Sequence, residues 1–541
     1  MQDLQTKSQT FETLRTQNFM YVDKTKHVYE LAKKDGAYFL SRPRRFGKSL
    51  LVSTFEALFK NKKELFKDLY IYDKWEWGTE YPVIKIDFGE IKTTDTEILN
   101  DDLIKTLNEN AENNNLELDQ TNASIPKKFS ELIKKLYQEK KQKVVILIDE
   151  YDKAIRNNLD KSIDIQTAIR EVLRDFYEVI KAKDQYIRFI FLTGVTKFAG
   201  LSLFSGLNTL NDITLDDKYS AICGYTQEEL ETNFVEYIEA LAKKYASSKK
   251  EILAEIRTWY NGYTWDGKTA IYNPFSTLLL FSKLDFANYW YASGSPKFLI
   301  DYLQKNWSEE LFFETIDVFE EELMSSEADP RVRIGLLFQT GYLTIKAITL
   351  MKGAGVISVR KIYTLMSPNC EVGISLAQTI LMPRISEVSG AVAISKLLPI
   401  FAESIAKEDE KIFAKGFDAL IALVPYQIQG ETESHYASNL LLSLKLMGFN
   451  VLAEKSGHKG RADIVWKYDK STVVIIEMKY AQSTQQIPEK IQEAFKQIEE
   501  KEYYKEYTLE ADKIILVALV VSDMGKKFEV EFNIKLKGKD F

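Results

Sequence analysis

Short apolar runs separated by longer amphipathic stretches form the main pattern of residues 1–220. The runs lie at 37–41, 82–88, 144–149 and 187–193, and they are rich in β-branched and aromatic residues. Continuous apolar runs of strand length, with helical periodicity between them, are typical of parallel strands that helices bury on both faces. The pattern therefore predicts an α/β domain built on a parallel sheet that is buried on both faces.

The pattern becomes mostly helical between residues 221 and 400. Within this region, residues 331–372 read as the end of a helix followed by two strands around a glycine-containing turn at 352–355. That order fits a winged-helix unit within 325–385. We therefore expect a mostly helical middle region that contains such a unit.

Residues 401–541 show a third pattern, with the order helix, three strands, helix and strand. We expect helices over about 433–447 and 488–501, and strands over 450–455, 462–468, 471–480 and 512–521. Helices and strands mixed in this way predict a separate α/β domain.

The overall composition is that of an ordinary globular protein, with 45% hydrophobic and 28% charged residues. The net charge of −7 provides no general basic field for nucleic acid, so any such contact must come from a local patch. Two cysteines and three histidines exclude a disulfide framework and a cysteine-rich zinc site. The longest apolar run, 514–521, is well short of the ~18 residues that span a bilayer, and no signal peptide is recognisable. We expect a cytoplasmic protein without a membrane partner.

Gly47, Lys48 and Ser49 indicate a phosphate-binding loop, because they lie between the first expected strand and a helix. At such a junction, backbone N–H groups and the positive end of the helix can hold phosphates. In the usual loop the lysine contacts the β- and γ-phosphates and the hydroxyl binds Mg²⁺, whereas here Arg42 replaces the usual first glycine. The expected ATP-binding residues are Arg45, Phe46, Gly47, Lys48, Ser49, Leu50 and Thr193.

Arg42, Arg44 and Arg45 add positive charge to this loop. They either contact phosphate or support the loop through acidic neighbours, and the sequence leaves both alternatives open.

Two adjacent carboxylates, Asp149 and Glu150, stand at the end of the apolar strand at 144–149. Asp149 is placed to hold Mg²⁺ together with Ser49, and Glu150 is placed to orient and activate the attacking water. The alternative is structural, with both acids at the start of a helix. Thr193 lies at the end of the last expected strand of this domain. A sensor of the γ-phosphate would lie at this position; the alternative is that Thr193 only ends the strand.

Several short segments distributed over nearly the whole chain carry a family resemblance. They are Tyr21-Val-Asp-Lys-Thr25, Ser41-Arg-Pro-Arg-Arg-Phe-Gly-Lys-Ser-Leu50, Asp149-Glu-Tyr-Asp152, Thr193-Gly194, Trp259-Tyr-Asn-Gly-Tyr263, Tyr272-Asn-Pro-Phe275 and Thr340-Gly-Tyr-Leu-Thr344. Together they closely resemble the bacterial AAA-ATPase-like family, in which arginine at position 42 is the family's own form of the loop. The resemblance implies a P-loop ATPase domain, commonly joined to a C-terminal PD-(D/E)xK nuclease-like domain. It also implies ATPase roles for Lys48, Ser49, Asp149 and Glu150.

Asp463, Glu477 and Lys479 form a second candidate set, in the expected C-terminal strands. Glu477 and Lys479 are two residues apart on one strand, so both side chains leave the same face. A hairpin centred on Lys470 puts Asp463 directly opposite Glu477, and like charges so close are destabilising unless a divalent cation lies between them. The alternative is an exposed cross-strand ion pair.

Two carboxylates that hold Mg²⁺, with a lysine that stabilises developing charge, suit phosphodiester hydrolysis. The order of elements, together with Gly460-Arg-Ala-Asp463 and Glu477-x-Lys479, resembles the PD-(D/E)xK superfamily, which implies catalytic roles for Asp463, Glu477 and Lys479. The complete expected set of metal ligands at the two sites is Ser49, Asp149, Glu433, Asp463 and Glu477.

Glu433 joins this set because it is an acid on the apolar stripe of the preceding helix. Gln497 matches the superfamily's pattern on the following helix, which implies that it orients the substrate. Local positive charge comes from Lys455, Lys459, Arg461 and Lys467, which are either solvated side chains or a joint contact for a phosphate backbone.

With ATP and Mg²⁺ as cofactors, the two sites predict an ATP-hydrolysing or ATP-gated nuclease that acts on DNA. One alternative is a nucleotide-dependent regulatory switch whose nuclease-like domain binds nucleic acid or a protein without cutting. A further alternative is an interaction protein that does not turn over ATP. The sequence leaves open the substrate preference, a homo-oligomeric state, and the arginine finger, for which Arg170 and Arg174 are candidates.

Overall fold

The computed structural model describes the chain except for residues 1, 7–9, 120–123, 160, 198–209, 291–314, 325–331, 352–359, 382–389, 424–431, 453–462, 470, 523–526 and 538–541. The chain forms two compact units. The first comprises Met1–Phe298 and Asp317–Asn369, and the second comprises Leu299–Ile316 and Cys370–Phe541.

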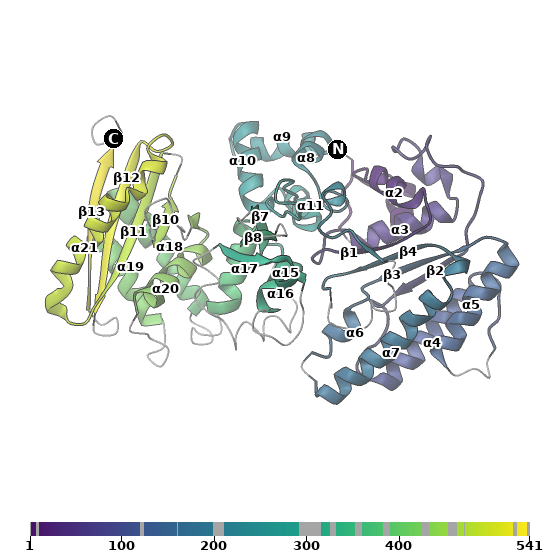
Figure 1. Ribbon diagram of the computed structural model, residues 1–541. Coiled ribbons are helices and arrows are strands. Elements are labelled where there is room, and N and C mark those ends of the chain that lie inside the picture. Colours follow the sequence, from purple (N-terminus) through teal and green to yellow (C-terminus); the bar gives the residue numbers. More distant parts are fainter. Residues whose placement is uncertain are drawn as a thin grey trace. The chain divides into compact units, whose positions relative to one another are not determined.

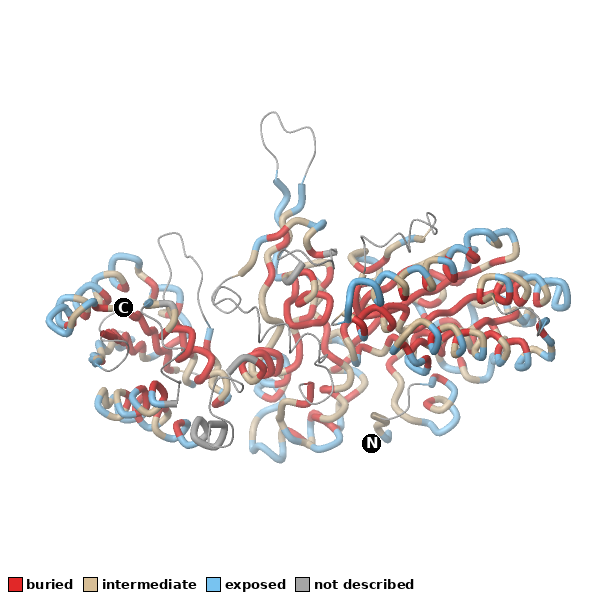
Figure 2. Tube along the Cα trace, turned by 90° about the horizontal axis from the view of Figure 1, so that it is seen from below, coloured by how far each residue is buried: buried red, intermediate tan, exposed pale blue. Residues whose placement is uncertain are grey.

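A five-stranded parallel sheet organises the first unit, with the strand order β2-β3-β4-β1-β5. Its strands are β1 (Gly36–Ser41), β2 (Val83–Asp87), β3 (Val144–Asp149), β4 (Ile187–Gly194) and β5 (Asn211–Asp212). The first four are the strands predicted from the apolar runs, and β5 is an addition. Every residue of β3 is buried, as expected for an inner parallel strand covered on both faces. Figure 2 colours the buried residues of the chain red.

Helices cover both faces of this sheet (Figure 1). One face carries α3 (Lys48–Phe59), and the other carries α4 (Thr96–Glu112), α5 (Ile125–Lys140) and α7 (Ile163–Ala182). The buried leucines of α4 recur every four residues and so form one stripe towards the core. Phe129 of α5 and Phe176 of α7 stack with ring centroids 4.7 Å apart, which ties these two helices together.

The rest of the first unit is mostly helical. It contains α1 (Phe11–Thr16), α2 (Thr25–Ala32), α6 (Lys153–Arg156), α8 (Gln227–Asn233), α9 (Val235–Lys244), α10 (Lys249–Tyr260), α11 (Pro274–Lys283), α15 (Glu320–Met324) and α16 (Val332–Thr340). Capping boxes start two of these helices, with Thr226 before α8 and Ser248 before α10.

The predicted helix end followed by two strands is confirmed. Helix α16 precedes the antiparallel strands β7 (Thr344–Met351) and β8 (Arg360–Met366), and β6 (Ile316–Phe319) adds a third strand beside β8. The expected turn at 352–355 lies outside the described residues.

The second unit is built on a mixed sheet with the order β13-β12-β11-β10-β9. Its strands are β9 (Val451–Leu452), β10 (Ile464–Lys467), β11 (Thr472–Ala481), β12 (Lys513–Ser522) and β13 (Lys527–Leu536). Strands β11 and β12 are parallel, and the other neighbours are antiparallel. The predicted order of helices and strands is confirmed, and β13 is an additional edge strand.

Among the residues that the structure describes, five helices accompany this sheet: α17 (Cys370–Leu381), α18 (Gly390–Lys407), α19 (Glu410–Leu423), α20 (Glu433–Leu446) and α21 (Ile487–Lys501). Ile491 and Ile498 of α21 are buried on the sheet, in clusters with residues of β11 and β12. The second unit therefore has its own core.

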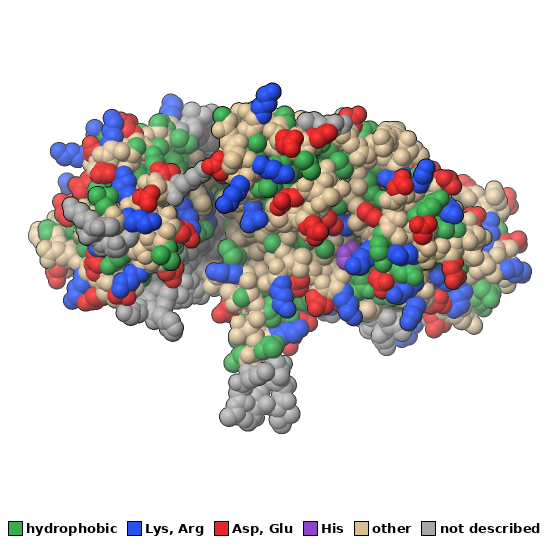
Figure 3. All heavy atoms as spheres, turned by 90° about the horizontal axis from the view of Figure 1, so that it is seen from above, with side chains coloured by type: hydrophobic (Ala, Val, Ile, Leu, Met, Phe, Trp, Pro, Cys, Tyr) green, Lys and Arg blue, Asp and Glu red, His purple; other side chains and the backbone are tan. Residues whose placement is uncertain are grey.

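Within the described part of the chain, no helix combines the length and apolarity that crossing a membrane requires. Acidic and basic side chains are interspersed over the face seen in Figure 3. That distribution agrees with a net charge of −7 and the absence of a general basic field.

Candidate functional site

The loop between β1 and α3 borders a cavity of about 420 Å³ in the first unit. Gly47 precedes α3 with φ +89°, a left-handed conformation that glycine adopts without steric cost. The predicted loop residues that line the cavity are Arg45, Phe46, Gly47, Lys48, Ser49 and Leu50. The first turn of α3 thus opens onto the cavity, which is where a helix N-terminus can bind phosphate.

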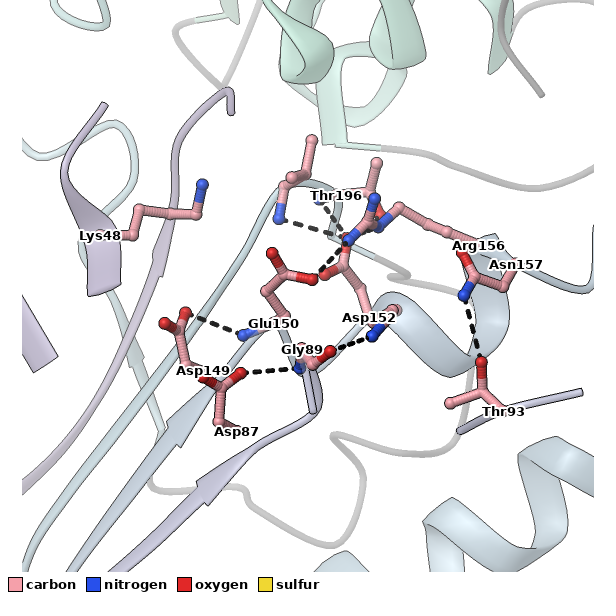
Figure 4. A network of polar contacts seen from close by, with 12 residues as sticks. Lys48, Asp87, Gly89, Thr93, Asp149, Glu150, Asp152, Arg156, Asn157 and Thr196 are labelled. Atoms are coloured by element: carbon pink, nitrogen blue, oxygen red, sulfur yellow. Dashed lines mark hydrogen bonds and ion pairs between the residues drawn. The ribbon is translucent and has the colours of Figure 1, made fainter. Parts of the chain in front are cut away.

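Lys48 is buried, and its Nζ donates to the carbonyl oxygens of Arg42 at 3.0 Å and Pro43 at 2.9 Å. Burial lowers the pKa of Lys48, and the negative charges of Asp149 and Glu150 oppose that shift. The loop therefore holds the ammonium group on its own backbone, next to the acids at the end of β3 (Figure 4).

Arg42 supports the loop and does not face the cavity. Its guanidinium donates to the carbonyls of Ser41, Thr214 and Tyr219, and lies 3.9 Å from the ring centroid of Trp265. Burial lowers its pKa to about 10. Of the two alternatives for this arginine, loop support is observed: its hydrogen bonds go to carbonyl groups, and the charges of Asp212 and Asp266 act on it in addition.

Asp149 contacts Ser49, which lines the cavity, although Asp149 itself is not among the lining residues. The parallel register sets Asp149 at the end of β3 beside Asp87 of β2, and the Ser49 hydroxyl donates to the Asp149 carboxylate. Burial raises the pKa of Asp149 to about 6, with Asp87 adding to the shift and the Ser49 bond opposing it. A hydroxyl and a carboxylate in contact are the oxygen ligands that fit Mg²⁺.

Glu150 lines the cavity with its side chain 37% exposed. Its φ of +49° is unusual for a residue with a Cβ, and such strain is characteristic of functional sites. The carboxylate faces Arg156, with Glu150 Oε2 3.7 Å from Arg156 Nη2 (Figure 4).

Asp152 and Arg156 are a buried pair that the sequence analysis did not single out. Arg156 Nε lies 2.7 Å from Asp152 Oδ2, and the same oxygen accepts from the backbone and hydroxyl of Thr196. The four-residue spacing on one helix was the available signal, but it is shared by many surface pairs.

Thr193 is fully buried, and its hydroxyl donates to the Leu40 carbonyl at 2.9 Å. The residue does not line the cavity. Its role as a phosphate sensor stays a prediction.

Several segments remote in sequence complete the cavity wall. They include Met20, Tyr21 and Val22, then Cys223, Gly224 and Tyr225, and finally Pro274 and Phe275. Gly224 has φ +82°, and a Cβ there would lie 2.2 Å from Ile271 Cγ2, so only glycine fits. Two of these segments belong to strings quoted above for the family resemblance, but neither was assigned to the site.

The second site lies on β10, β11 and α20. Ile464 pairs with Ile476, which is the register predicted from a hairpin centred on Lys470 and puts position 463 opposite 477. Glu433, Asp463 and Glu477 each offer a carboxylate oxygen, and these atoms all lie within 4.8 Å of one another. Three carboxylates so close form a candidate metal centre.

Lys479 is bound to two of these acids. Its Nζ lies 2.9 Å from Glu477 Oε1 and 3.0 Å from Glu433 Oε1, and it donates to the Met478 carbonyl at 2.9 Å. Although burial opposes the shift, Glu477 and Glu433 raise the pKa of Lys479. Glu477 is 1% and Lys479 6% exposed, so the alternative of an exposed ion pair is wrong.

Glu477 has a strongly raised pKa. Burial, followed by the charge of Asp463, raises its pKa to about 8, against the attraction of Lys479. Its Oε2 is buried and makes no hydrogen bond to any described residue. An orphaned carboxylate oxygen beside two further carboxylates fits a divalent cation as the missing partner.

Gln497 lies on α21, and its Nε2 donates to the hydroxyl of Tyr503 at 3.2 Å. Burial raises the pKa of Tyr503, and the charges of Glu477 and Asp463 add to the shift, so this pair lies near the carboxylates.

Of the basic residues expected around the site, Lys455, Lys459 and Arg461 lie outside the described residues, as does the segment from Gly460 to Ala462. Lys467 is turned towards Glu510, with 3.2 Å between Nζ and Oε2.

Family models and a curated protein match this chain. A family model described as "Predicted AAA-ATPase" (AAA-ATPase-like) matches residues 7–204, and a model of the PD-(D/E)XK nuclease superfamily matches residues 431–531. The chain is also 34% identical over 522 residues, covering 95% of each sequence, to an uncharacterized protein in the vnfD 5' region of Azotobacter chroococcum mcd 1.

Proposed function

Because this chain belongs to the AAA-ATPase-like family and ends in a domain of the PD-(D/E)XK nuclease superfamily, we propose that it hydrolyses ATP and cuts DNA in a Mg²⁺-dependent reaction. One observation carries the nuclease part: Glu433, Asp463 and Glu477 converge around a buried carboxylate oxygen that has no hydrogen-bond partner among the described residues.

In the first unit, Ser49 and Asp149 would hold Mg²⁺, which would neutralise charge on the phosphates. Lys48 and the N-terminus of α3 bind the β- and γ-phosphates, since both border the cavity. Glu150 accepts the proton of the water that attacks the γ-phosphorus, while the bond to the bridging oxygen breaks.

In the second unit, the three carboxylates would hold Mg²⁺, which would lower the pKa of a bound water and polarise the phosphodiester. Lys479 stabilises the negative charge that develops when water attacks phosphorus and one P–O ester bond breaks. Gln497, fixed by Tyr503, orients the substrate. ATP binding or hydrolysis in the first unit regulates this cleavage.

The test uses the purified chain with supercoiled and linear DNA, Mg²⁺ and ATP. Asp463→Asn and Lys479→Ala should each abolish cleavage and leave ATP hydrolysis intact, whereas Lys48→Ala should abolish ATP hydrolysis. Lys467→Ala is the matched control, because that lysine is engaged by Glu510.

Cleavage that persists in both Asp463→Asn and Lys479→Ala would refute the nuclease assignment. DNA or RNA binding without cleavage by the wild type would favour the alternative of a nucleotide-dependent switch that binds without cutting.

A further inference from the structure

Arg156 lies between two carboxylates, that of Glu150, which borders the cavity, and that of Asp152, which is buried. Its Nη2 lies 3.7 Å from Glu150 Oε2, and its Nε lies 2.7 Å from Asp152 Oδ2 (Figure 4). The side chain of Arg156 is 1% exposed, whereas that of Glu150 is 37% exposed. The arginine is therefore fixed, and the acid that it faces is not fully enclosed.

Asp152 gives this arginine a rigid support. Its Oδ2 accepts from the backbone N–H of Val195 at 3.2 Å and of Thr196 at 2.8 Å, and from the Thr196 hydroxyl at 2.7 Å. Tyr151 adds a bond from its hydroxyl to the Thr196 carbonyl. The segment after β4 thus holds Asp152, and Asp152 holds Arg156.

A structural pair would need only the contact between Arg156 and Asp152. The Nε, Nη1 and Nη2 atoms of Arg156 are all buried, and none makes a hydrogen bond within the described residues; Nε is in ion-pair contact with Asp152 Oδ2, and Nη2 is the atom that faces Glu150. This end of the guanidinium faces Glu150, so its donors remain available to the carboxylate that borders the cavity.

We propose that Arg156 is a positioning residue that holds the Glu150 carboxylate where it can accept the proton of the attacking water. The inference rests on the proposed ATPase function. A partly exposed glutamate samples several rotamers. The buried guanidinium group of Arg156 lies on one side of Glu150 and restricts its side chain to the rotamers that face the cavity. The arginine acts through Glu150 and touches no phosphate.

A double-mutant cycle on the purified chain tests this role. Steady-state ATP hydrolysis is measured for wild type, Arg156→Gln, Glu150→Gln and the double variant, together with binding of a non-hydrolysable ATP analogue. Arg188→Gln is the matched control, because Arg188 is a half-buried arginine on β4 that contacts Tyr81 and the Ala32 carbonyl instead of Glu150.

We expect Arg156→Gln to lower kcat by about 10- to 100-fold with KM for ATP changed less than about threefold. In the Glu150→Gln background the same change should lower kcat by less than about twofold, because the residue through which Arg156 acts is already lost. Arg156→Lys keeps the positive charge but lacks the planar guanidinium group, so its kcat should lie between those of Arg156→Gln and the wild type.

Equal losses of kcat in both backgrounds would overturn the proposal, as would a rise in KM at unchanged kcat. If Arg156→Gln does not fold, the cycle is run with Arg156→Lys under the same criteria. If the wild type hydrolyses ATP but the cycle shows no coupling between Arg156 and Glu150, the role of Arg156 is refuted and the ATPase proposal stands. Wild-type protein that does not hydrolyse ATP refutes the ATPase proposal as well.

Discussion

Lys479 and Glu477 leave the same face of β11 and meet as a buried ion pair, with 2.9 Å between Lys479 Nζ and Glu477 Oε1. Asp463 and Glu433 bring two further carboxylates to the same place. One lysine compensates only part of this negative charge. The remaining charge favours either protonation or a bound cation, and the following two predictions separate these states.

Without divalent metal, the free energy of unfolding should fall as the pH rises from about 5 to 8. The folded state keeps a proton on Glu477 up to a pKa of about 8, whereas the unfolded chain releases it near 4.5. In this window the folded state binds more protons, so raising the pH favours unfolding, by about 1–3 kcal/mol in total. Urea unfolding in EDTA across this range checks the slope. Glu477→Gln should flatten it, and a variant with the wild-type slope would contradict the interpretation.

Millimolar Mg²⁺ at pH 8 should raise the unfolding temperature of the second unit by a few degrees, because a ligand that binds only the folded state stabilises it. Differential scanning calorimetry with and without EDTA measures the shift. Asp463→Asn should remove it, since it takes one ligand from the centre. Glu510→Gln, which changes an exposed acid outside the centre, serves as the control. A shift of equal size in Asp463→Asn would show that Mg²⁺ binds elsewhere.

Arg42→Gly restores the usual loop glycine but should destabilise this chain. The variant loses donors to three carbonyl groups and the contact with Trp265. We expect a loss of about 2–4 kcal/mol in unfolding free energy and at least about tenfold weaker ATP binding. Arg45→Ala, which removes an exposed arginine from the same loop, should change stability by less than about 0.5 kcal/mol. Equal stability of the two variants would argue against loop support by Arg42.

Gly224→Ala should be more destabilising than another glycine substitution with the same backbone strain. Gly224 and Gly78 both have positive φ, but an added Cβ meets Ile271 Cγ2 at 2.2 Å in the first case and nothing within 4 Å in the second. We expect a cost of about 2–4 kcal/mol for Gly224→Ala and about 1 kcal/mol for Gly78→Ala. Chemical unfolding compares them, and ATP binding should weaken only in Gly224→Ala. Similar costs would show that the cavity wall yields to the new methyl group.

The sequence was sufficient where local periodicity decides geometry. The two-residue repeat of a strand placed Glu477 and Lys479 on one face, and the hairpin centre fixed the register that Ile464 and Ile476 adopt. Four apolar runs likewise gave the parallel strands, because helices on both faces of the sheet make most of the strand positions apolar.

Other features depend on contacts between distant segments, which one sequence does not reveal. The cavity wall at Tyr21, Cys223 and Phe275 is assembled from three separate stretches. Asp152 precedes α6 and Arg156 ends it, a four-residue spacing that carries no sign of burial, and their burial arises only from packing. Strand β13 was missed because its apolar residues alternate with charged ones, so that it lacks the continuous run that marks the other strands.

The two carbonyl bonds of Lys48 affect the thermodynamics of the first unit. An incoming triphosphate has to draw the ammonium group away from the Arg42 and Pro43 oxygens, which must then find water or new donors. Measured affinity will thus report an exchange of partners rather than the full strength of a lysine–phosphate contact. These two carbonyl oxygens thus compete with the phosphates of the nucleotide for the ammonium group of Lys48.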